Sequence, residues 1–295
     1  MEPTAGILTI DGTNCHNETW HAFKQAGAKA EIVHLNTLIK GYDPAQPKRK
    51  KISLQDYDIL VIPGGFSYGD DISAGKVFAT DLEYFLGEEL RKFVNAGKPI
   101  IGICNGFQVL VKYGLLPKID GEIKQTTTLT DNENQNFECR WVRLVNYQAN
   151  KDKCIWTRGI EYLDLPVAHG EGRFEASKEV CSELFAKDLV VFRYADLNNR
   201  PTKKFPDNPN QSRLEIAAIC DETGLIFGLM PHPERYNLPE NHHLSHLQEI
   251  LSREYVDRAN PVIRERIRQI GVLPKQGLGL KIFENAVNYI KENKK

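Results

Sequence analysis

The residues with the clearest chemical potential lie in the segment Gly102-Ile103-Cys104-Asn105-Gly106, where a cysteine is flanked by glycines. The segment follows an apolar run and precedes a helical pattern, so it joins a strand to a helix. A strained turn of this kind holds a nucleophile clear of the backbone. At a helix N-terminus the dipole favours the Cys104 thiolate, and the Asn105 amide can face an oxyanion. The alternative is an ordinary buried cysteine at the end of a strand.

A histidine and a carboxylate stand two residues apart in Pro231-His232-Pro233-Glu234. Residues i and i+2 of an extended segment face the same side, so Glu234 can orient His232 while His232 addresses a thiol. Taken alone, a His-x-Glu pair is more often a pair on the protein surface. Together with Cys104, it predicts a Cys-His-Glu triad for covalent catalysis.

A third segment, residues 59–70, is an apolar strand that ends in the glycines Gly64 and Gly65. Backbone without a side chain lets an amide approach a substrate closely, so Gly65 is a candidate for the second oxyanion donor. The alternative is a phosphate-binding loop. However, a Walker loop has four residues between its glycines and then Gly-Lys-Ser/Thr, whereas five residues separate Gly69 from Gly75 and Val77 follows Lys76. This motif therefore does not indicate ATP binding.

Composition narrows the class of protein that could position these residues. The chain has 295 residues, of which 41% are apolar and 26% charged, as in an ordinary globular protein. Its 38 basic and 39 acidic side chains nearly balance, so no global field would recruit nucleic acid or a membrane surface. The sequence has no stretch long and apolar enough for a membrane span, and its six cysteines form no CxxC pair. These features predict a cytoplasmic protein with reduced thiols and no metal site.

The first half of the chain alternates short β-branched runs with helical patterns, which predicts parallel strands joined by crossover helices. Strands are expected near residues 5–10, 31–35, 59–62 and 100–104, and helices near 18–25, 82–95 and 107–113. In such a doubly wound α/β sheet, ligands bind at the carboxyl ends of the strands.

The second half contains mostly strand-like stretches, near residues 137–145, 190–194, 216–220 and 226–230, which predict added antiparallel strands. A final helix has apolar residues at helical spacing, Leu280, Phe283, Val287 and Ile290, and this stripe is typical of a face packed on the core. The basic cluster at 48–51 lacks interleaved aromatic residues and is interpreted as a solvated loop.

Five motifs together resemble the glutaminase subunit or domain of phosphoribosylformylglycinamidine synthase, within the class I glutamine amidotransferases. They run in chain order over residues 63–70, 102–108, 136–142, 166–174 and 230–235. The resemblance implies a flavodoxin-like, mostly parallel sheet in a single domain over residues 1–295, with a C-terminal helical extension.

The resemblance also assigns roles to individual residues. It implies that Cys104 is the nucleophile, His232 the general base and acid, and Glu234 the orienting carboxylate. Gly65 and Asn105 would supply the oxyanion amides. Four further residues would bind the substrate glutamine or border its pocket: Phe66, Gln108, His169 and Arg173. Glu171 lies in the same motif as His169 without an assigned role, and His169 could instead be a structural turn residue.

The implied function is hydrolysis of glutamine and delivery of ammonia to a synthetase of purine biosynthesis. Partners would be a large synthetase subunit, which would hold ATP and Mg²⁺, and a small bridging subunit; this chain itself would need no cofactor. Two alternatives remain open: an amidotransferase subunit of another pathway, and a non-catalytic regulatory subunit on the same fold.

Two departures from the family pattern bear on structure. Gln211 stands where the family has a glycine, so the loop lacks a residue that adopts positive φ readily. Residues 237–277 form an insertion before the last helix, with an apolar helical pattern at 262–270 that would either dock a partner or pack on its own domain. Its histidines, His242, His243 and His246, lack a second ligand pair for a metal.

Overall fold

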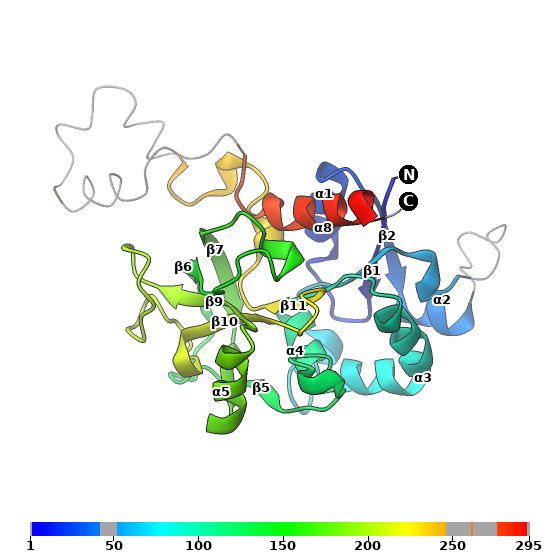
Figure 1. The fold of residues 1–295 in the computed structure, drawn as a ribbon, viewed down its shortest axis with the longest axis horizontal. Coiled ribbons are helices and arrows are strands. Elements are labelled where there is room, and N and C mark those ends of the chain that lie inside the picture. The colour runs from blue at the N-terminus through cyan, green and yellow to red at the C-terminus, as the bar shows by residue number, and fades with distance from the viewer. Residues whose placement is uncertain (1, 42–51, 246–260, 262–275, 294–295) are drawn as a thin grey trace.

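A nine-stranded sheet forms the centre of the molecule (Figure 1), and its strand order is β2-β1-β3-β4-β11-β10-β9-β6-β7. The computed structural model describes residues 2–41, 52–245, 261 and 276–293. Neighbouring strands are parallel from β2 to β11 and antiparallel from β11 to β7. The predicted parallel sheet with added antiparallel strands is therefore confirmed.

The elements have the following bounds. The strands are β1 Thr4–Thr9, β2 Lys29–His34, β3 Ile59–Ile62, β4 Ile100–Ile103, β5 Thr127–Thr130, β6 Glu138–Asn146, β7 Tyr162–His169, β8 Arg173–Ala176, β9 Val190–Ala195, β10 Ile216–Cys220 and β11 Ile226–Leu229. The α-helices are α1 His16–Gln25, α2 Leu35–Lys40, α3 Lys76–Asn95, α4 Asn105–Tyr113, α5 Lys178–Ala186 and α8 Leu280–Asn293. Strands β5 and β8 form a separate antiparallel pair.

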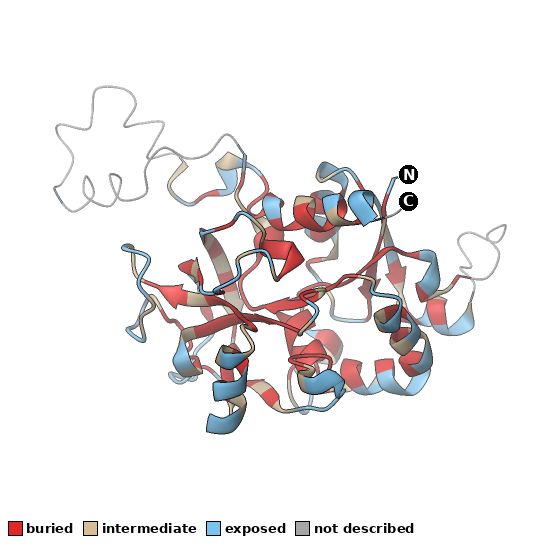
Figure 2. Ribbon diagram, in the orientation of Figure 1, coloured by how far each residue is buried: buried red, intermediate tan, exposed pale blue. Residues whose placement is uncertain are grey.

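Helices cover both faces of the parallel half of the sheet, with α1 and α8 on one side and α3 and α4 on the other (Figure 1). Strands β3, β4 and β11 are buried along their whole length (Figure 2), as expected for unbroken apolar runs between two helical layers. The apolar stripe of α8 is buried, and Phe283 meets Phe23 of α1 edge to face with ring centroids 5.0 Å apart. The prediction that this stripe packs on the core is confirmed.

Some sequence-based expectations fall outside the described residues, namely the basic cluster at 48–51, the apolar pattern at 262–270 and His246. His242 and His243 are described, and both rings lie against Trp141 of β6, with centroids 4.7 and 5.1 Å away. In the part of the chain that the structure describes, no helix has the length and apolar character that a bilayer crossing requires.

Candidate active site

The three segments expected to do chemistry follow the carboxyl ends of three adjacent parallel strands. Gly64 and Gly65 come after β3, Cys104 directly after β4, and His232 shortly after β11. Gly106 permits the close approach of α4 to β3, since a Cβ atom there would lie 1.8 Å from the carbonyl oxygen of Ile62. The sheet thus brings together segments that are up to 168 residues apart in sequence.

Cys104 adopts the strained backbone expected of a nucleophile elbow. Its φ and ψ are 52° and −106°, a combination that is rare for a residue with a side chain. Its N–H donates to the carbonyl of Leu229 at 2.8 Å, and its Sγ lies 3.7 Å from the carbonyl oxygen of Ala168 on β7. The turn is therefore held by β11 on one side, and its sulfur faces β7.

Burial governs the protonation state of the thiol. Desolvation raises the pKa of Cys104 well above its usual value, and the nearby Cys15 and Glu234 raise it further. Arg235 and the Asn105 backbone amide lower the pKa but do not outweigh burial. The predicted effect of the helix terminus is present, since the Asn105 amide favours the thiolate, but burial favours the thiol more strongly. A nucleophilic thiolate therefore requires a base within reach.

His232 and Glu234 form the expected pair at the buried end of β11. Nδ1 of His232 lies 2.6 Å from Oε1 of Glu234, and both side chains are almost fully buried. The His232 backbone N–H donates to the carbonyl of Pro166 at 2.8 Å. Because the carboxylate accepts from Nδ1, Nε2 is the basic nitrogen, and it is buried with no hydrogen-bond partner among the described residues.

The peptide between Gly64 and Gly65 is fixed from one side by the start of α1. The carbonyl oxygen of Gly64 accepts hydrogen bonds from the backbone N–H groups of Asn14 and Cys15, at 3.3 and 3.1 Å. In a trans peptide the carbonyl and the following N–H point in opposite directions. The Gly65 N–H therefore points away from residues 14 and 15. Reversing this peptide would break two hydrogen bonds.

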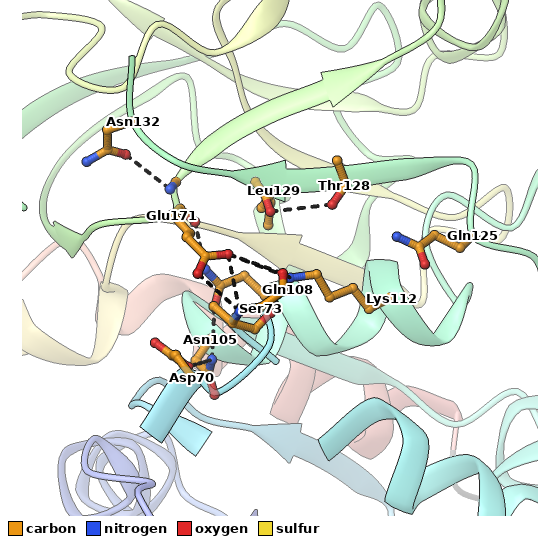
Figure 3. Close-up of polar contacts among 12 residues, drawn as sticks. Asp70, Ser73, Asn105, Gln108, Lys112, Gln125, Thr128, Leu129, Asn132 and Glu171 are labelled. Atoms are coloured by element: carbon orange, nitrogen blue, oxygen red, sulfur yellow. Dashed lines mark hydrogen bonds and ion pairs between the residues drawn. The ribbon is translucent and has the colours of Figure 1, made fainter. Parts of the chain in front are cut away.

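On the other side of Cys104, the side chains of α4 join a polar network with the loop that follows β3 (Figure 3). Nδ2 of Asn105 donates to Asp70 at 3.2 Å and to Oε1 of Gln108 at 2.9 Å. Nε2 of Gln108 donates to the carbonyl of Glu171 at 2.6 Å. Both ends of the Gln108 amide are thus bonded within the protein, and they place Glu171 next to the elbow.

Glu171 and Lys112 hold residues 73 and 74 of the same loop (Figure 3). The Glu171 carboxylate accepts from the Ala74 N–H at 3.1 and 3.2 Å and from the Ser73 hydroxyl at 3.3 Å. Nζ of Lys112 donates to the Ser73 hydroxyl and the Ala74 carbonyl, and lies 3.8 Å from Glu171. Burial lowers the pKa of Lys112. Burial is also the main reason that the pKa of Asp70 is raised to about 6, and the charge of Glu171 is the second reason.

His169 lies at the end of β7 in a buried cluster of amides. Its Nδ1 is 3.1 Å from Oδ1 of Asn132 and its Nε2 is 3.4 Å from Nδ2 of Asn210. Burial and the nearby His232 lower the pKa of His169 to about 3, so its ring is neutral at physiological pH. These contacts connect β7 with residues 208–212.

Arg173 and Phe66, the other residues expected near the glutamine pocket, are partly exposed. Arg173 begins β8, and its Nε lies 3.8 Å from Glu175. Phe66 is 43% exposed and its ring lies 6.3 Å from that of Phe137, which is 54% exposed. A substrate-binding role for either residue stays a prediction.

Residue 211 adopts the conformation for which the family uses glycine. Gln211 has a φ of 59°, in the left-handed region, and its side-chain amide donates to the carbonyl of Asn208 at 2.9 Å. The loop therefore keeps a glycine-like turn without a glycine.

Sequence reasoning missed three residues of this neighbourhood: Cys15, Lys112 and Arg235. The Arg235 guanidinium donates to Sγ of Cys15 at 3.0 Å, although the two residues are 220 positions apart. Lys112 is buried near the end of α4, where nothing in the sequence indicated a role. For Arg235, the only indication in the sequence was its position directly after Glu234.

Comparisons with known proteins agree on one family. The model of the CobB/CobQ-like glutamine amidotransferase domain matches residues 2–290. Phosphoribosylformylglycinamidine synthase subunit PurQ of Methanococcus maripaludis is 42% identical over 293 residues, covering 97% of both chains. The subunit of the same name from Dehalococcoides mccartyi is 41% identical over 288 residues, again covering 97% of each. Among solved structures, PurLQS from Thermotoga maritima matches with a TM-score of 0.64 and 27% identity, covering 98% of this chain and 100% of the other.

Proposed function

The chain belongs to the family of CobB/CobQ-like glutamine amidotransferase domains, and from this premise we propose that it is the glutaminase subunit of a phosphoribosylformylglycinamidine synthase. It hydrolyses glutamine to glutamate and ammonia and delivers the ammonia for conversion of formylglycinamide ribonucleotide to its amidine in purine biosynthesis. The observation that carries this proposal is the convergence of Cys104, His232 and Glu234 at the ends of adjacent strands, in a chain whose relatives are named for this enzyme over nearly their full length.

The first half of the reaction is attack of the Cys104 sulfur on the side-chain carbonyl carbon of glutamine. Because the buried thiol keeps its proton at rest, Nε2 of His232 accepts that proton as the sulfur–carbon bond forms. Glu234 holds the ring in the required tautomer and stabilises the imidazolium. The backbone N–H groups of Gly65 and Asn105 stabilise the oxyanion.

The second half releases both products. The tetrahedral intermediate collapses to a thioester as His232 returns its proton to the departing nitrogen, which leaves as ammonia. His232 then takes a proton from water, whose oxygen attacks the thioester carbonyl at the same oxyanion site. Cleavage of the carbon–sulfur bond releases glutamate, and His232 gives its proton to the departing sulfur, which restores the Cys104 thiol.

The ammonia acceptor belongs to other subunits. The partners are a large synthetase subunit, which holds ATP and Mg²⁺, and a small bridging subunit. The relative named PurLQS supports an assembly of this kind, and the lack of a Walker motif in this sequence supports placing ATP elsewhere. Residues 1–295 make one amidotransferase domain, and residues 237–277 are an insertion within it. The free state of all six cysteines supports a reducing, cytoplasmic setting.

The synthetase covers the apolar rim beside the site, which we define as Phe66, Ile72 and Phe137. Phe66 follows the oxyanion glycine Gly65, and Ile72 of the same loop is 90% exposed with a φ of 70°. A β-branched residue in the left-handed region has an unfavourable backbone conformation, and an exposed side chain does not offset that cost by burial within its own chain. Its placement is accounted for by burial against a partner that receives ammonia next to Gly65.

Partner binding activates the glutaminase. Ammonia made without an acceptor is wasted, so the site should be productive only when the synthetase holds its own substrates. The Gly64–Gly65 peptide is the candidate switch, because one oxyanion donor contributes roughly 3 kcal/mol to the transition state. Glutaminase rates for the chain alone, with the synthetase, and with synthetase, acceptor and ATP should rise in that order. Equal rates would exclude the coupling.

The function itself is tested by replacing the nucleophile within the assembled enzyme. Cys104→Ala should lower glutamine-dependent amidine formation by several decades, the order of loss seen when a covalent-catalysis unit is broken. The same complex should keep its activity with free ammonia, which bypasses this subunit. Cys181→Ala, in a buried cysteine of α5, is the matched control. Normal glutamine-dependent activity in the Cys104→Ala complex would overturn the proposal.

A further inference from the structure

A second cysteine lies beside the triad, at the start of α1. The Cys15 side chain is buried, and its Sγ has three polar neighbours: Nη2 of Arg235 at 3.0 Å, Oδ1 of Asn14 at 3.1 Å and Nδ1 of His232 at 3.9 Å. It donates to the Asn14 amide oxygen and accepts from the guanidinium. The Cys15 sulfur is therefore in contact with both the histidine of the triad and the arginine that follows it.

Gly64 leaves the room in which these groups meet. A Cβ atom at this position would lie 2.9 Å from Cε1 of His232, 3.2 Å from Sγ of Cys15 and 3.4 Å from Cβ of Cys104. The two cysteines and the histidine thus border one small space beside the oxyanion peptide. Displacement of any one of them alters the packing of the others.

Arg235 is the cation nearest to the triad carboxylate in the described part of the chain. Its Nε lies 4.0 Å from Oε1 of Glu234, whose side chain is fully buried, whereas the Arg235 side chain is 36% exposed. A buried carboxylate requires a nearby positive charge or hydrogen bonds to remain ionised. Arg235 also lines a hollow of about 480 Å³ together with Glu18 and His21 of α1, and its guanidinium donates to the Cys15 sulfur.

From these contacts we propose that Cys15 is a positioning residue for the glutaminase reaction: its thiol holds Arg235 against Glu234 and so fixes the His232–Glu234 pair. The inference rests on the proposed function. Cys15 is not a second nucleophile, because its Sγ contacts Nδ1 of His232, the nitrogen bonded to Glu234, whereas Nε2 is the nitrogen that would accept a thiol proton. Nor are Cys15, His232 and Glu234 a cation site, although their donor atoms lie within 4.8 Å of one another, since the guanidinium occupies that neighbourhood.

The proposal implies an electrostatic contribution to catalysis. The titratable groups around His232 include Cys15, Cys104, His169 and Glu234. A positive charge beside them favours the deprotonated form of each acid. Loss of the Arg235 charge should therefore move the acidic limb of the pH–rate profile to higher pH, whichever of these groups titrates there.

The test is a double-mutant cycle on Cys15→Ala and Arg235→Met, with glutaminase kinetics measured in the assembled synthetase. Each single variant should lower kcat about tenfold, which corresponds to roughly 1.4 kcal/mol, with KM changed less than twofold. The double variant should be no slower than the slower single variant, because both changes remove one unit. Cys15→Ser, whose hydroxyl can also accept from the guanidinium, should recover most of the rate. Cys181→Ala is the matched control.

Three results would overturn the proposal: an unchanged kcat in Cys15→Ala, additive losses in the double variant, or an acidic limb that does not move in Arg235→Met. Thermal unfolding of each variant identifies a fold defect, and Cys15→Ser keeps the test valid if Cys15→Ala does not fold. A wild-type complex without glutaminase activity would instead refute the proposed function. Active wild type with unaffected variants would refute only the role of Cys15.

Discussion

The two sides of Cys104 are held in different ways. On the triad side, the strand ends place His232 and Glu234 through backbone bonds such as that from the His232 N–H to Pro166. On the loop side, which we define as residues 66–75, the chain bends through positive φ values at Tyr68, Asp70 and Ile72. That loop is held by the charged side chains of Glu171 and Lys112.

We propose that this difference separates the catalytic groups from the part of the site that a partner could influence. The triad side is nearly closed to water and rests on the sheet, so its geometry is expected to persist under any condition in which the chain is folded. The loop side contains two buried or half-buried charged groups with shifted pKa values, raised for Asp70 and lowered for Lys112, so its stability should depend on pH. Substitutions on the triad side should therefore have their largest effect on the catalytic rate. Substitutions on the loop side should have their largest effect on the free energy of unfolding and its dependence on pH.

The largest effect is expected on the triad side. His232→Ala should lower glutaminase turnover by several decades, because it removes Nε2, the buried and unpartnered nitrogen that would take the Cys104 proton. Glu234→Ala should lose fewer decades, since Glu234 orients the ring and does not itself move a proton. Steady-state kinetics of the assembled enzyme measure both. Equal losses would mean that Glu234 takes part in proton transfer.

A smaller effect is expected from Glu171→Gln on the loop side. The change removes a carboxylate that accepts from Ala74 and Ser73 and leaves Lys112 with less compensation. Hydrogen bonds to charged groups contribute about 1.5–3 kcal/mol, so the unfolding free energy should fall by about that amount. Denaturant titration measures it. Glu183→Gln, at an exposed position of α5, is the control. If the two variants were equally stable, the loop would not depend on Glu171.

Asp70→Asn should make the stability of the loop side less dependent on pH. The folded pKa of Asp70 is raised to about 6, with burial as the main cause. An acid with a raised pKa contributes stability below its unfolded pKa, near 4, and that contribution is lost as pH rises through about 6. The variant should therefore gain stability relative to wild type between pH 4 and pH 7.

Thermal unfolding across this range tests the Asp70 prediction, with Asp71→Asn at the neighbouring exposed position as control. A constant difference between wild type and Asp70→Asn at all pH values would show that Asp70 does not titrate there.

The smallest effect is expected outside both sides, at Gln211. A glycine would adopt the left-handed φ of 59° without strain. It would also lose the side-chain hydrogen bond to Asn208, and the more flexible unfolded chain would lose more conformational entropy on folding. These terms nearly cancel, so Gln211→Gly should change the unfolding free energy by less than about 1 kcal/mol. Calorimetry of the two proteins measures the difference, and a larger stabilisation would mean that the residue is strained beyond its backbone angle.

Strands and turns whose residues show a clear apolar or glycine pattern were predicted from the sequence. The apolar runs of β3 and β10 were predicted at their observed bounds, and the glycines around Cys104 marked the elbow. Strand β7 alternates between buried and outward residues, but it was missed because proline argues against a strand; Pro166 is tolerated there since β7 is an edge strand. Helix α5 was also missed, because its nine residues carry only a short apolar pattern.

Contacts between distant segments could not be predicted in this way. No periodicity relates Cys15 to Arg235, or Lys112 to Ser73, because these pairs meet only after the sheet and its crossovers have formed. The net pKa of Cys104 could not be predicted for the same reason. The helix terminus can be read from a motif, whereas the depth of burial depends on the whole fold.

The central claim is that Cys104 is the nucleophile and Cys15, in the same small space, is not. A glutamine-analogue diazo-ketone, which alkylates the thiol that attacks it, discriminates between the two cysteines when labelled peptides are mapped by mass spectrometry. We expect one label per chain, on Cys104, and none on Cys15 or on exposed Cys139. Labelling of Cys15 with Cys104 unmodified would contradict the account.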